Sequence, residues 1–475
     1  MTVTRCLVRS GAYHDSVVLM RLQAGLAELP GVADAAVVMG TEANRELLAA
    51  SGLLVEEAAR ARADDLLVVV KAADAAAAEA ALGRVDALLT TRAATAADGA
   101  FRPRTLASAV KLLPEARWVL VSVPGRYAAA VAREALALGR HVFLYSDNVA
   151  LADEIELKRT ARERGLLVMG PDCGTAIIGG VGFGFANRVR RGAIGLIGAS
   201  GTGLQAVASR IHALGAGVSQ ALGTGGRDLA AEVGGATALQ ALELLARDEA
   251  TRAIVLISKP PDPGVVAKLL REAGAVGKPV VCCFLGMPLP VRQLGNLHFS
   301  GGLDETAEKA VQLAAVDNPH SHPERSEGSG GRAGYLRGLF AGGTLALETL
   351  LALRPLATPI YSNLSAPGVQ PLTDLGRSLA HTILDLGDDE LTVGRPHPML
   401  DHTLRLRRLR QEAADPEVAA ILLDVVLGEG AHPDPAAELA PAVAEARAAA
   451  ARDGRELEVI VLLVGTDEDP QGLER

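Results

Sequence analysis

The sequence predicts a multidomain α/β protein, and three observations lead to this fold class. Apolar runs of strand length alternate with helical patterns almost throughout the 475 residues, as in layered α/β domains. Hydrophobic residues make up 49% of the chain, which is enough for several cores, and the scarcity of aromatic residues (3%) favours thin, closely packed helix–sheet layers. At roughly 100–200 residues per domain, a chain of this length predicts about three domains.

Residues 1–95 are predicted to form a small ferredoxin-like α/β domain, because strand and helix patterns alternate in the order that such a domain requires. The predicted strands are Thr4–Val8, Ala35–Met39 and Leu66–Lys71, and the predicted helices are Asp15–Leu29, Glu42–Ala50 and Asp74–Leu89.

Residues 105–190 are predicted to form a Rossmann-like domain in which each strand ends in a loop of small and polar residues. The predicted strands are Trp118–Val123, His141–Leu144 and Leu166–Met169, and the predicted helices are Leu106–Lys111, Tyr127–Leu138 and Leu151–Arg164. The loops are Ser122–Gly125, Ser146–Asn148 and Gly170–Gly174. Because ligands bind at the carboxyl ends of parallel strands, these loops mark the expected binding edge.

Residues 191–316 form a third predicted unit, with strands at Ile194–Ile197, Gly217–Leu222, Ala253–Ser258 and Val280–Leu285. The first strand runs into Gly198-Ala-Ser-Gly-Thr-Gly203, and a helical pattern follows from Leu204. The first turn of a helix has unpaired N–H groups, and the helix dipole attracts an anion there. We therefore predict an oxyanion or phosphate site, although the loop matches neither nucleotide fingerprint and a tight turn without a ligand is the alternative. The residues of this predicted site are Ser200, Gly201, Thr202 and Gly203.

Residues 317–333 are polar and rich in turn-forming types, which predicts a flexible linker. The last unit, residues 334–475, has predicted strands at Thr382–Asp385, Val418–Asp424 and Val459–Val464. The sequence stops just after the last strand, where an α/β unit normally adds a helix. We therefore expect this domain either to be incomplete or to pack against a partner.

Charge and targeting signals narrow the class of function. The net charge of -9 argues against nucleic acid or an anionic membrane surface as the main partner. The N-terminus lacks a signal-peptide core and no apolar run reaches about 18 residues, so a cytoplasmic protein is expected. The four cysteines include no Cys-x-x-Cys pair and have no histidine nearby at metal-ligand spacing, so no metal site is predicted.

Short motifs in the second, third and fourth units resemble succinyl-CoA synthetase and its relatives. Ser122-Val-Pro-Gly-Arg-Tyr127 is similar to that family's first CoA loop, Ser146-Asp-Asn148 to its second, and Met169-Gly-Pro-Asp-Cys-Gly174 to its Ile-Gly-Pro-Asn-Cys-Pro segment. The resemblance implies a CoA-binding Rossmann-like domain, two flavodoxin-like ligase domains, and phosphate binding at the Ser200–Gly203 turn. The CoA-contacting residues that it implies are Ser122, Pro124, Gly125, Tyr127, Ser146, Asp147, Asn148, Pro171 and Asp172.

Nearly the whole chain resembles the FdrA-type branch of this superfamily, through Met169–Thr175, Ser258-Lys-Pro-Pro261 and Thr392-Val-Gly-Arg-Pro-His-Pro-Met399. This resemblance implies an acyl-CoA synthetase-like ligase that uses CoA and a phosphate or acyl phosphate. Two alternatives stay open, a subunit of a carbamoyl (oxamate-type) transferase complex in ureide or allantoin breakdown and a non-catalytic CoA-binding scaffold. A small anionic substrate and a homo-oligomer or partner subunits are expected, and binding of a nucleotide with Mg²⁺ is left open.

Two departures from the family pattern bear on the chemistry. Succinyl-CoA synthetases phosphorylate a histidine in a Gly-His-Ala-Gly segment, whereas the corresponding stretch here is Gly295-Asn-Leu-His-Phe299, with His298 displaced. The glutamate that holds that histidine is matched by Lys259. An ammonium group would repel a protonated histidine, so no phosphohistidine is expected. We predict instead that Lys259 helps the Ser200–Gly203 turn to hold an anion, the alternative being a solvated lysine on a proline-rich loop.

A loop with two prolines supplies two further catalytic candidates beside Lys259, because proline restricts the backbone and can hold side chains in fixed directions. Arg395 could place its guanidinium on a carboxylate, and His397 could reach a reacting oxygen. The alternative is a rigid connector whose arginine pairs with an aspartate within residues 385–389. His432 follows the next strand and is a weaker candidate for the same cleft.

Overall fold

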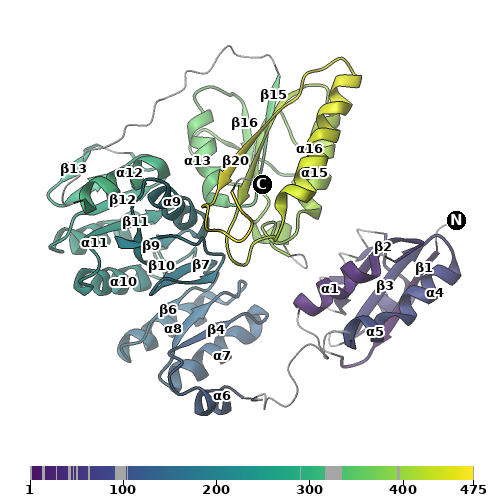
Figure 1. The fold of residues 1–475 in the computed structure, drawn as a ribbon, viewed down its shortest axis with the longest axis horizontal. Coiled ribbons are helices and arrows are strands. Elements are labelled where there is room, and N and C mark those ends of the chain that lie inside the picture. The colour runs from purple at the N-terminus through teal and green to yellow at the C-terminus, as the bar shows by residue number, and fades with distance from the viewer. Residues whose placement is uncertain are drawn as a thin grey trace. The chain divides into compact units, whose positions relative to one another are not determined.

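A computed structural model of the protein describes residues 3–12, 16–27, 29–40, 44–45, 48–49, 52–62, 65–90, 103, 105–288, 290–315, 334–392 and 396–473. The chain divides into two compact units (Figure 1). One unit consists of Met1–Arg102 with Thr392–Pro396, and the other of Pro103–Leu391 with His397–Arg475. Among the helices in these described ranges, none is both long and apolar enough to cross a lipid bilayer.

The N-terminal unit has the predicted ferredoxin-like order of strands and helices. Its elements are β1 (Val3–Arg9), α1 (Ser16–Ala27), β2 (Val32–Met39), α3 (Glu56–Ala59), β3 (Leu66–Ala72), α4 (Ala75–Gly83) and α5 (Val85–Thr90). The described strands form an antiparallel sheet in the order β1-β3-β2. Because β3 is central, Leu66 and Val68 enter one core and Leu67 and Val69 enter the core on the opposite face. The predicted helix Glu42–Ala50 lies partly outside the described residues.

The segment predicted to be Rossmann-like builds a small parallel sheet, in the order β4-β5-β6 over the described residues. Its elements are α6 (Leu106–Leu112), β4 (Trp118–Val121), α7 (Gly125–Ala137), β5 (His141–Leu144), α8 (Leu151–Glu163) and β6 (Val168–Met169). Leu136 of α7 and Leu157 of α8 pack against Val142 and Leu144 of β5. The next two strands, β7 (Thr175–Ile178) and β8 (Val181–Gly184), belong to the following sheet. This domain therefore ends before the predicted boundary at residue 190.

The next unit is a doubly wound sheet, eight-stranded within the described residues, in the order β13-β14-β12-β11-β9-β10-β7-β8. Its further strands are β9 (Arg191–Ala199), β10 (Val218–Gly223), β11 (Ala253–Ser258), β12 (Val280–Phe284), β13 (Gln293–Leu294) and β14 (Leu297–Phe299). Its helices are α9 (Gly201–Ala213), α10 (Ala236–Arg247), α11 (Pro263–Gly274) and α12 (Leu303–Ala314). Strands β9 to β12 run parallel, with α9 and α12 on one face and α10 and α11 on the other (Figure 1), which explains their continuous apolar runs.

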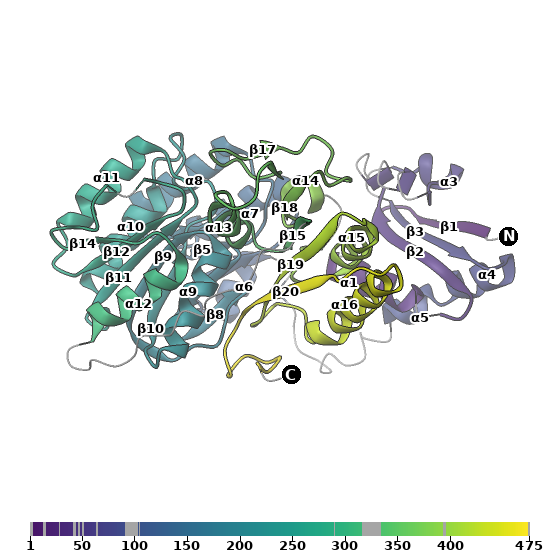
Figure 2. The same ribbon diagram turned by 90° about the horizontal axis from the view of Figure 1, so that it is seen from above.

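The last unit is a second parallel sheet, in the order β17-β16-β18-β15-β19-β20 over the part that the structure describes. Its strands are β15 (Tyr335–Phe340), β16 (Ile360–Ser362), β17 (Gln370–Pro371), β18 (His381–Asp385), β19 (Val418–Val426) and β20 (Glu458–Val464). Its helices are α13 (Gly343–Leu353), α14 (Asp389–Thr392), α15 (Thr403–Ala414) and α16 (Pro435–Arg452). Helices α15 and α16 cover one face and α13 covers the other (Figure 2), while β20 forms an edge.

One hydrophobic core joins the last two sheets. Val207 and Ile211 of α9 belong to the same buried cluster as Leu345 and Leu350 of α13. The two helices therefore pack directly on each other, and each of them starts immediately after a strand of its own sheet. This packing determines where the two helix N-termini lie.

Candidate functional site

The predicted anion-binding turn begins α9, as the glycine-rich pattern indicated. Ser200 is the N-cap residue, and its hydroxyl accepts a hydrogen bond from the N–H of Gly203 at 3.0 Å. Thr175 lies beside this turn, and its buried hydroxyl oxygen has no hydrogen-bond partner among the described residues. That oxygen is 3.2 Å from the position that a Cβ on Gly201 would occupy. An unsatisfied buried hydroxyl next to a helix start is a place where a ligand oxygen would be stabilised.

The N-terminus of α13 meets the N-terminus of α9. The hydroxyl oxygens of Ser200 and Thr344 are 2.5 Å apart, and a Cβ on Gly342 would lie only 2.5 Å from Cγ2 of Thr202. Two helix dipoles therefore direct their positive ends toward one junction, which favours negative charge. This second helix start was not predicted from the sequence, although Gly342-Gly-Thr344 after a strand repeats the pattern found before α9.

A buried aspartate holds the start of α13 in place. The carboxylate of Asp424 accepts the N–H groups of Ala341 at 2.7 Å and Gly342 at 2.9 Å. Arg405 of α15 forms an ion pair with it, at 3.2 Å between Nη2 and Oδ1, and also donates to the Asp424 carbonyl at 2.6 Å. Burial raises the pKa of Asp424, and the Arg405 charge and the two N–H groups oppose that rise. Neither Asp424 nor Arg405 was a candidate from the sequence.

Lys259 lies at the same junction. It directly follows β11, is half-buried, and forms no ion pair among the described residues. A Cβ on Gly343 would overlap the Asp385 carboxylate and lie 2.7 Å from Lys259 Nζ, so only glycine allows both groups to reach the α13 backbone. Burial raises the pKa of Asp385 to about 6, although Lys259 and the Gly387 N–H oppose this rise.

His397 stands beside Asp385, on the far side of Gly387. The N–H of Gly387 donates to Asp385 Oδ1 at 3.0 Å, and a Cβ on Gly387 would be 2.9 Å from His397 Nε2. Nδ1 of His397 accepts the N–H of Met399 at 3.2 Å, which leaves the ring proton on Nε2. Burial and the charge of Arg405 lower the pKa of His397 to about 4, so the ring is neutral at pH 7. His397 can therefore donate a hydrogen bond here but carries no charge.

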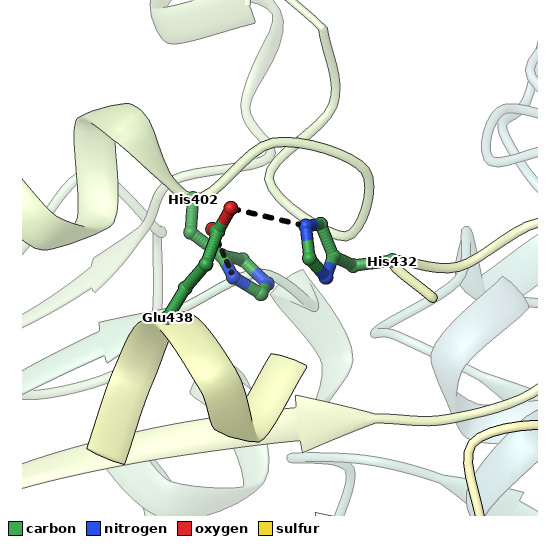
Figure 3. Close-up of side chains that lie close together, drawn as sticks. All are labelled: His402, His432 and Glu438. Carbon is green, nitrogen blue, oxygen red and sulfur yellow. Dashed lines mark ion pairs between the residues drawn. The ribbon is translucent and has the colours of Figure 1, made fainter. Parts of the chain in front are cut away.

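Two other candidates are not part of this arrangement. Arg395 lies outside the described residues. His432 contacts His402 and Glu438, its ring centroid 4.7 Å from that of His402 (Figure 3). The histidine therefore belongs to a separate cluster in the last unit.

The residues expected to contact CoA gather at the carboxyl edge of the small β4-β5-β6 sheet. Residues 122–127, 146–148 and 171–172 follow its strands in turn. The hydroxyl of Ser146 joins the first two segments by accepting the N–H of Val123 at 3.0 Å. The structure thus brings these predicted residues together on one edge.

The backbone of this edge is tightly constrained. Asn148 and Asp172 have φ values of 51° and 53°, in the left-handed region that Asn and Asp tolerate best. Gly125 begins α7, and a Cβ there would overlap the carbonyl of Asp147 and lie 2.5 Å from that of Asn148. Tyr127 on the first turn of α7 is 50% exposed and so presents its ring to solvent. These loops are close enough for their backbone groups to bind one ligand.

His298 lies in β14 with only 8% of its surface exposed, and burial together with the Lys309 charge lowers its pKa. Replacing His298 with alanine is expected to leave phosphate affinity unchanged, and the wild type should carry no acid-labile phosphate after incubation with radiolabelled ATP. Phosphate titration and an acid-quench assay measure both. Acid-labile phosphate on the wild type that is absent from the His298→Ala variant would instead assign a phosphohistidine to this position.

Comparison with protein families and sequences finds three matching domains and a close relative that spans nearly the whole chain. Family models match residues 1–104 ("AllF, heavy metal-associated domain"), 189–286 ("CoA binding domain") and 339–475 ("CoA-ligase"). The CoA-binding model thus covers β9 to β12, one unit beyond the loops at 122–172. Escherichia coli YahF, an uncharacterized protein, is 44% identical over 489 residues, covering 99% of this chain and 93% of YahF.

More distant relatives are named for their activities. Subunit alpha 2 of the ADP-forming succinate–CoA ligase of Archaeoglobus fulgidus is 28% identical, over 42% of this chain and 69% of that one. The ATP citrate lyase of Methanothrix soehngenii, solved with citrate and coenzyme A, is 16% identical with a TM-score of 0.39, over 66% of this chain and 56% of the lyase. The 44% identity to YahF over nearly the full length of both proteins shows that the chain belongs to the YahF family, and its own CoA-binding and CoA-ligase domains identify it as an FdrA-type protein of the succinyl-CoA synthetase-like superfamily.

Proposed function

We propose that the protein is a ligase-type enzyme of CoA-related acyl chemistry that binds the phosphoryl group of an acyl phosphate between α9 and α13. The observation that carries this proposal is the meeting of two helix N-termini beside Lys259, an ammonium group without an ion pair among the residues described. Backbone N–H groups that are already oriented stabilise the charge that develops on phosphoryl and acyl oxygens. The family assignment supports acyl chemistry with CoA in general.

Each nearby side chain has a distinct role in this proposal. Lys259 compensates the charge of the phosphoryl group. Asp385, with a pKa raised to about 6, can hold or release a proton near neutral pH. His397, which is neutral, donates a hydrogen bond from its Nε2–H group to an acyl oxygen. The residues at 122–127, 146–148 and 171–172 are proposed to hold CoA.

A thermal-shift panel of CoA, Mg-ATP, carbamoyl phosphate and small dicarboxylates tests this function. We expect stabilisation by CoA and by the acyl phosphate analogue, because a ligand that binds only the native state raises its stability. The Lys259→Ala variant should lose the response to carbamoyl phosphate and keep the response to CoA. Stabilisation by none of these compounds would contradict the proposal.

A second candidate is a carbamoyl transferase subunit of a larger complex, with phosphate as one product. The observation that favours it is that Lys259 stands where succinyl-CoA synthetases have the glutamate that holds their phosphohistidine. Group transfer to or from phosphate needs no phosphohistidine. In this function the exposed Ile460 and Leu463 on edge strand β20 contact a partner subunit or a second copy. An assay of carbamoyl phosphate synthesis with candidate partner subunits distinguishes this function from the first. Ligand binding without turnover in every reconstituted complex would favour a CoA-binding scaffold.

Anion affinity should fall as the pH rises through about 6. Asp385 is neutral below that value and charged above it, and a charged carboxylate repels an anion at the α13 N-terminus. The other charged groups that act on Asp385 are Lys259, Asp388 and Asp424. Sulfate is a suitable probe because it does not titrate in this range, and we expect its dissociation constant to be about tenfold larger at pH 7.5 than at pH 5. In the Asp385→Asn variant the constant should not change with pH, and an equal pH dependence in both proteins would contradict this role.

A further inference from the structure

A compact cluster of two histidines and a glutamate lies outside the proposed acyl phosphate site (Figure 3). His402 is the N-cap residue of α15, His432 lies in the loop after β19, and Glu438 lies in the first turn of α16. Three separate elements of the last unit therefore bring these side chains together. His402 lies well before His432 and Glu438 in the sequence, so no spacing pattern indicates this cluster.

The distances within the cluster suit a small metal ion. Oε2 of Glu438 is 3.2 Å from Nδ1 of His402, and its Oε1 is 3.2 Å from Nε2 of His432. One ligand atom from each of the three residues lies within 4.8 Å of the other two. With metal–ligand bonds of about 2.0–2.1 Å, neighbouring ligand atoms of a tetrahedral zinc site are about 3.3 Å apart. Small side-chain movements would complete such a site.

An unsatisfied atom in the cluster indicates a missing partner. His402 is only 3% exposed, and its Nδ1 is buried without a hydrogen-bond partner, although Glu438 is near. Buried polar atoms in native proteins are nearly always satisfied, so each exception calls for a cause. With the ring proton on Nε2, the buried Nδ1 of His402 has a free lone pair for a ligand.

The surroundings allow a cation to enter and to stay. The side chain of Glu438 is 44% exposed, which opens the cluster to solvent. The positive charge of Arg405 acts on His402 and would oppose a bound cation. Asp424 compensates this charge through an ion pair at 3.2 Å. Nδ1 of His432 accepts the N–H of Asp434 at 3.2 Å. Metal binding at Nε2 moves the ring proton to Nδ1 and so replaces this weak hydrogen bond with a metal bond.

We propose that His402, His432 and Glu438 form a binding site for a divalent transition metal, with Zn²⁺ the best match. Two imidazoles and one carboxylate are a donor set that zinc uses in proteins, with one position left for water or a substrate oxygen. A bound ion would tie the start of α15 and the loop after β19 to α16. This site is independent of the proposed acyl phosphate site.

Zinc titration of the chelator-treated full-length protein, in competition with a chromophoric chelator, tests the proposal. We expect one equivalent that is lost, or bound at least tenfold more weakly, in Glu438→Gln and in His432→Ala. Glu445→Gln is the matched control, because Glu445 is an exposed residue of the same helix and its replacement should leave binding unchanged. Circular dichroism of each variant confirms that it is folded.

Two further measurements distinguish zinc binding at this site from zinc binding elsewhere in the chain. The Cys6→Ser variant should keep the equivalent, because the proposed site contains no thiol. With Co²⁺ as the probe, the wild type should show d–d bands of nitrogen and oxygen ligation without a thiolate charge-transfer band. Equal zinc binding by wild type, Glu438→Gln and His432→Ala would overturn the proposal, and so would the failure of the wild type to bind zinc at micromolar concentration.

Discussion

The Lys259→Ala variant will bind inorganic phosphate at least tenfold more weakly than the wild type, a loss of about 1.4 kcal/mol. Lys259 is the ammonium group at the junction of the α9 and α13 N-termini, and it forms no ion pair within the described ranges. Hydrogen bonds to charged groups contribute more than neutral ones, because the opposite charge strengthens them. Removing the ammonium also leaves the Asp385 carboxylate uncompensated, so the anion meets a more negative site.

Isothermal titration with phosphate at pH 7.5 measures this effect. Lys268→Ala is the matched control, because Lys268 is an exposed lysine on α11 of the same unit. Lys259→Arg should recover part of the affinity, since it keeps the charge but changes its position. An unchanged dissociation constant in Lys259→Ala would show that this lysine is solvated and takes no part in anion binding.

The Asp424→Ala variant will lower the stability of the last unit by about 3–5 kcal/mol. Asp424 is fully buried and is the ion-pair partner of Arg405, which is itself only 2% exposed. Truncating the aspartate leaves a buried guanidinium without its carboxylate, and it also leaves the N–H groups of Ala341 and Gly342 without an acceptor. Both effects act at the start of α13, so phosphate affinity should fall together with stability.

Urea denaturation and hydrogen exchange of the α13 amides measure this loss. Exchange at α13 should accelerate most, because local opening there becomes less costly. Asp453→Asn is the control, since Asp453 is exposed and its ion pair with Arg455 spans 3.9 Å. If the urea midpoint and the α13 exchange rates stay at the wild-type values, the Asp424–Arg405 pair does not hold the helix start.

The strength of each sequence pattern decided how much of the fold was predictable. The apolar run at Ile194–Ile197 predicted the centre of β9, and the glycines after it predicted the start of α9. By contrast, β15 was missed because Arg337 interrupts its apolar pattern. In the structure Arg337 is buried, because Glu412 and Asp415 pair with it at 2.9 Å and 3.0 Å.

The same missed strand explains the gap in the predicted site. A helix start can be predicted as an anion site only when the strand before it is also predicted. Because β15 was not predicted, the start of α13 at Gly343 was not predicted as a site either. Lys259 was found through a family resemblance. The grouping of His402, His432 and Glu438 depends on how α15 and α16 pack on β19. This packing could not be predicted from one sequence.

The core that α9 shares with α13 also determines how two halves of the chain, residues 191–315 and 334–473, stay together. Val207 and Ile211 would be exposed to water if Leu345 and Leu350 were pulled away from them, at roughly 1.5–3 kcal/mol for each large side chain. Cohesion of the halves therefore does not require a continuous peptide between residues 315 and 334. A chain cleaved there, or translated as two separate polypeptides, is expected to assemble into one complex through this core.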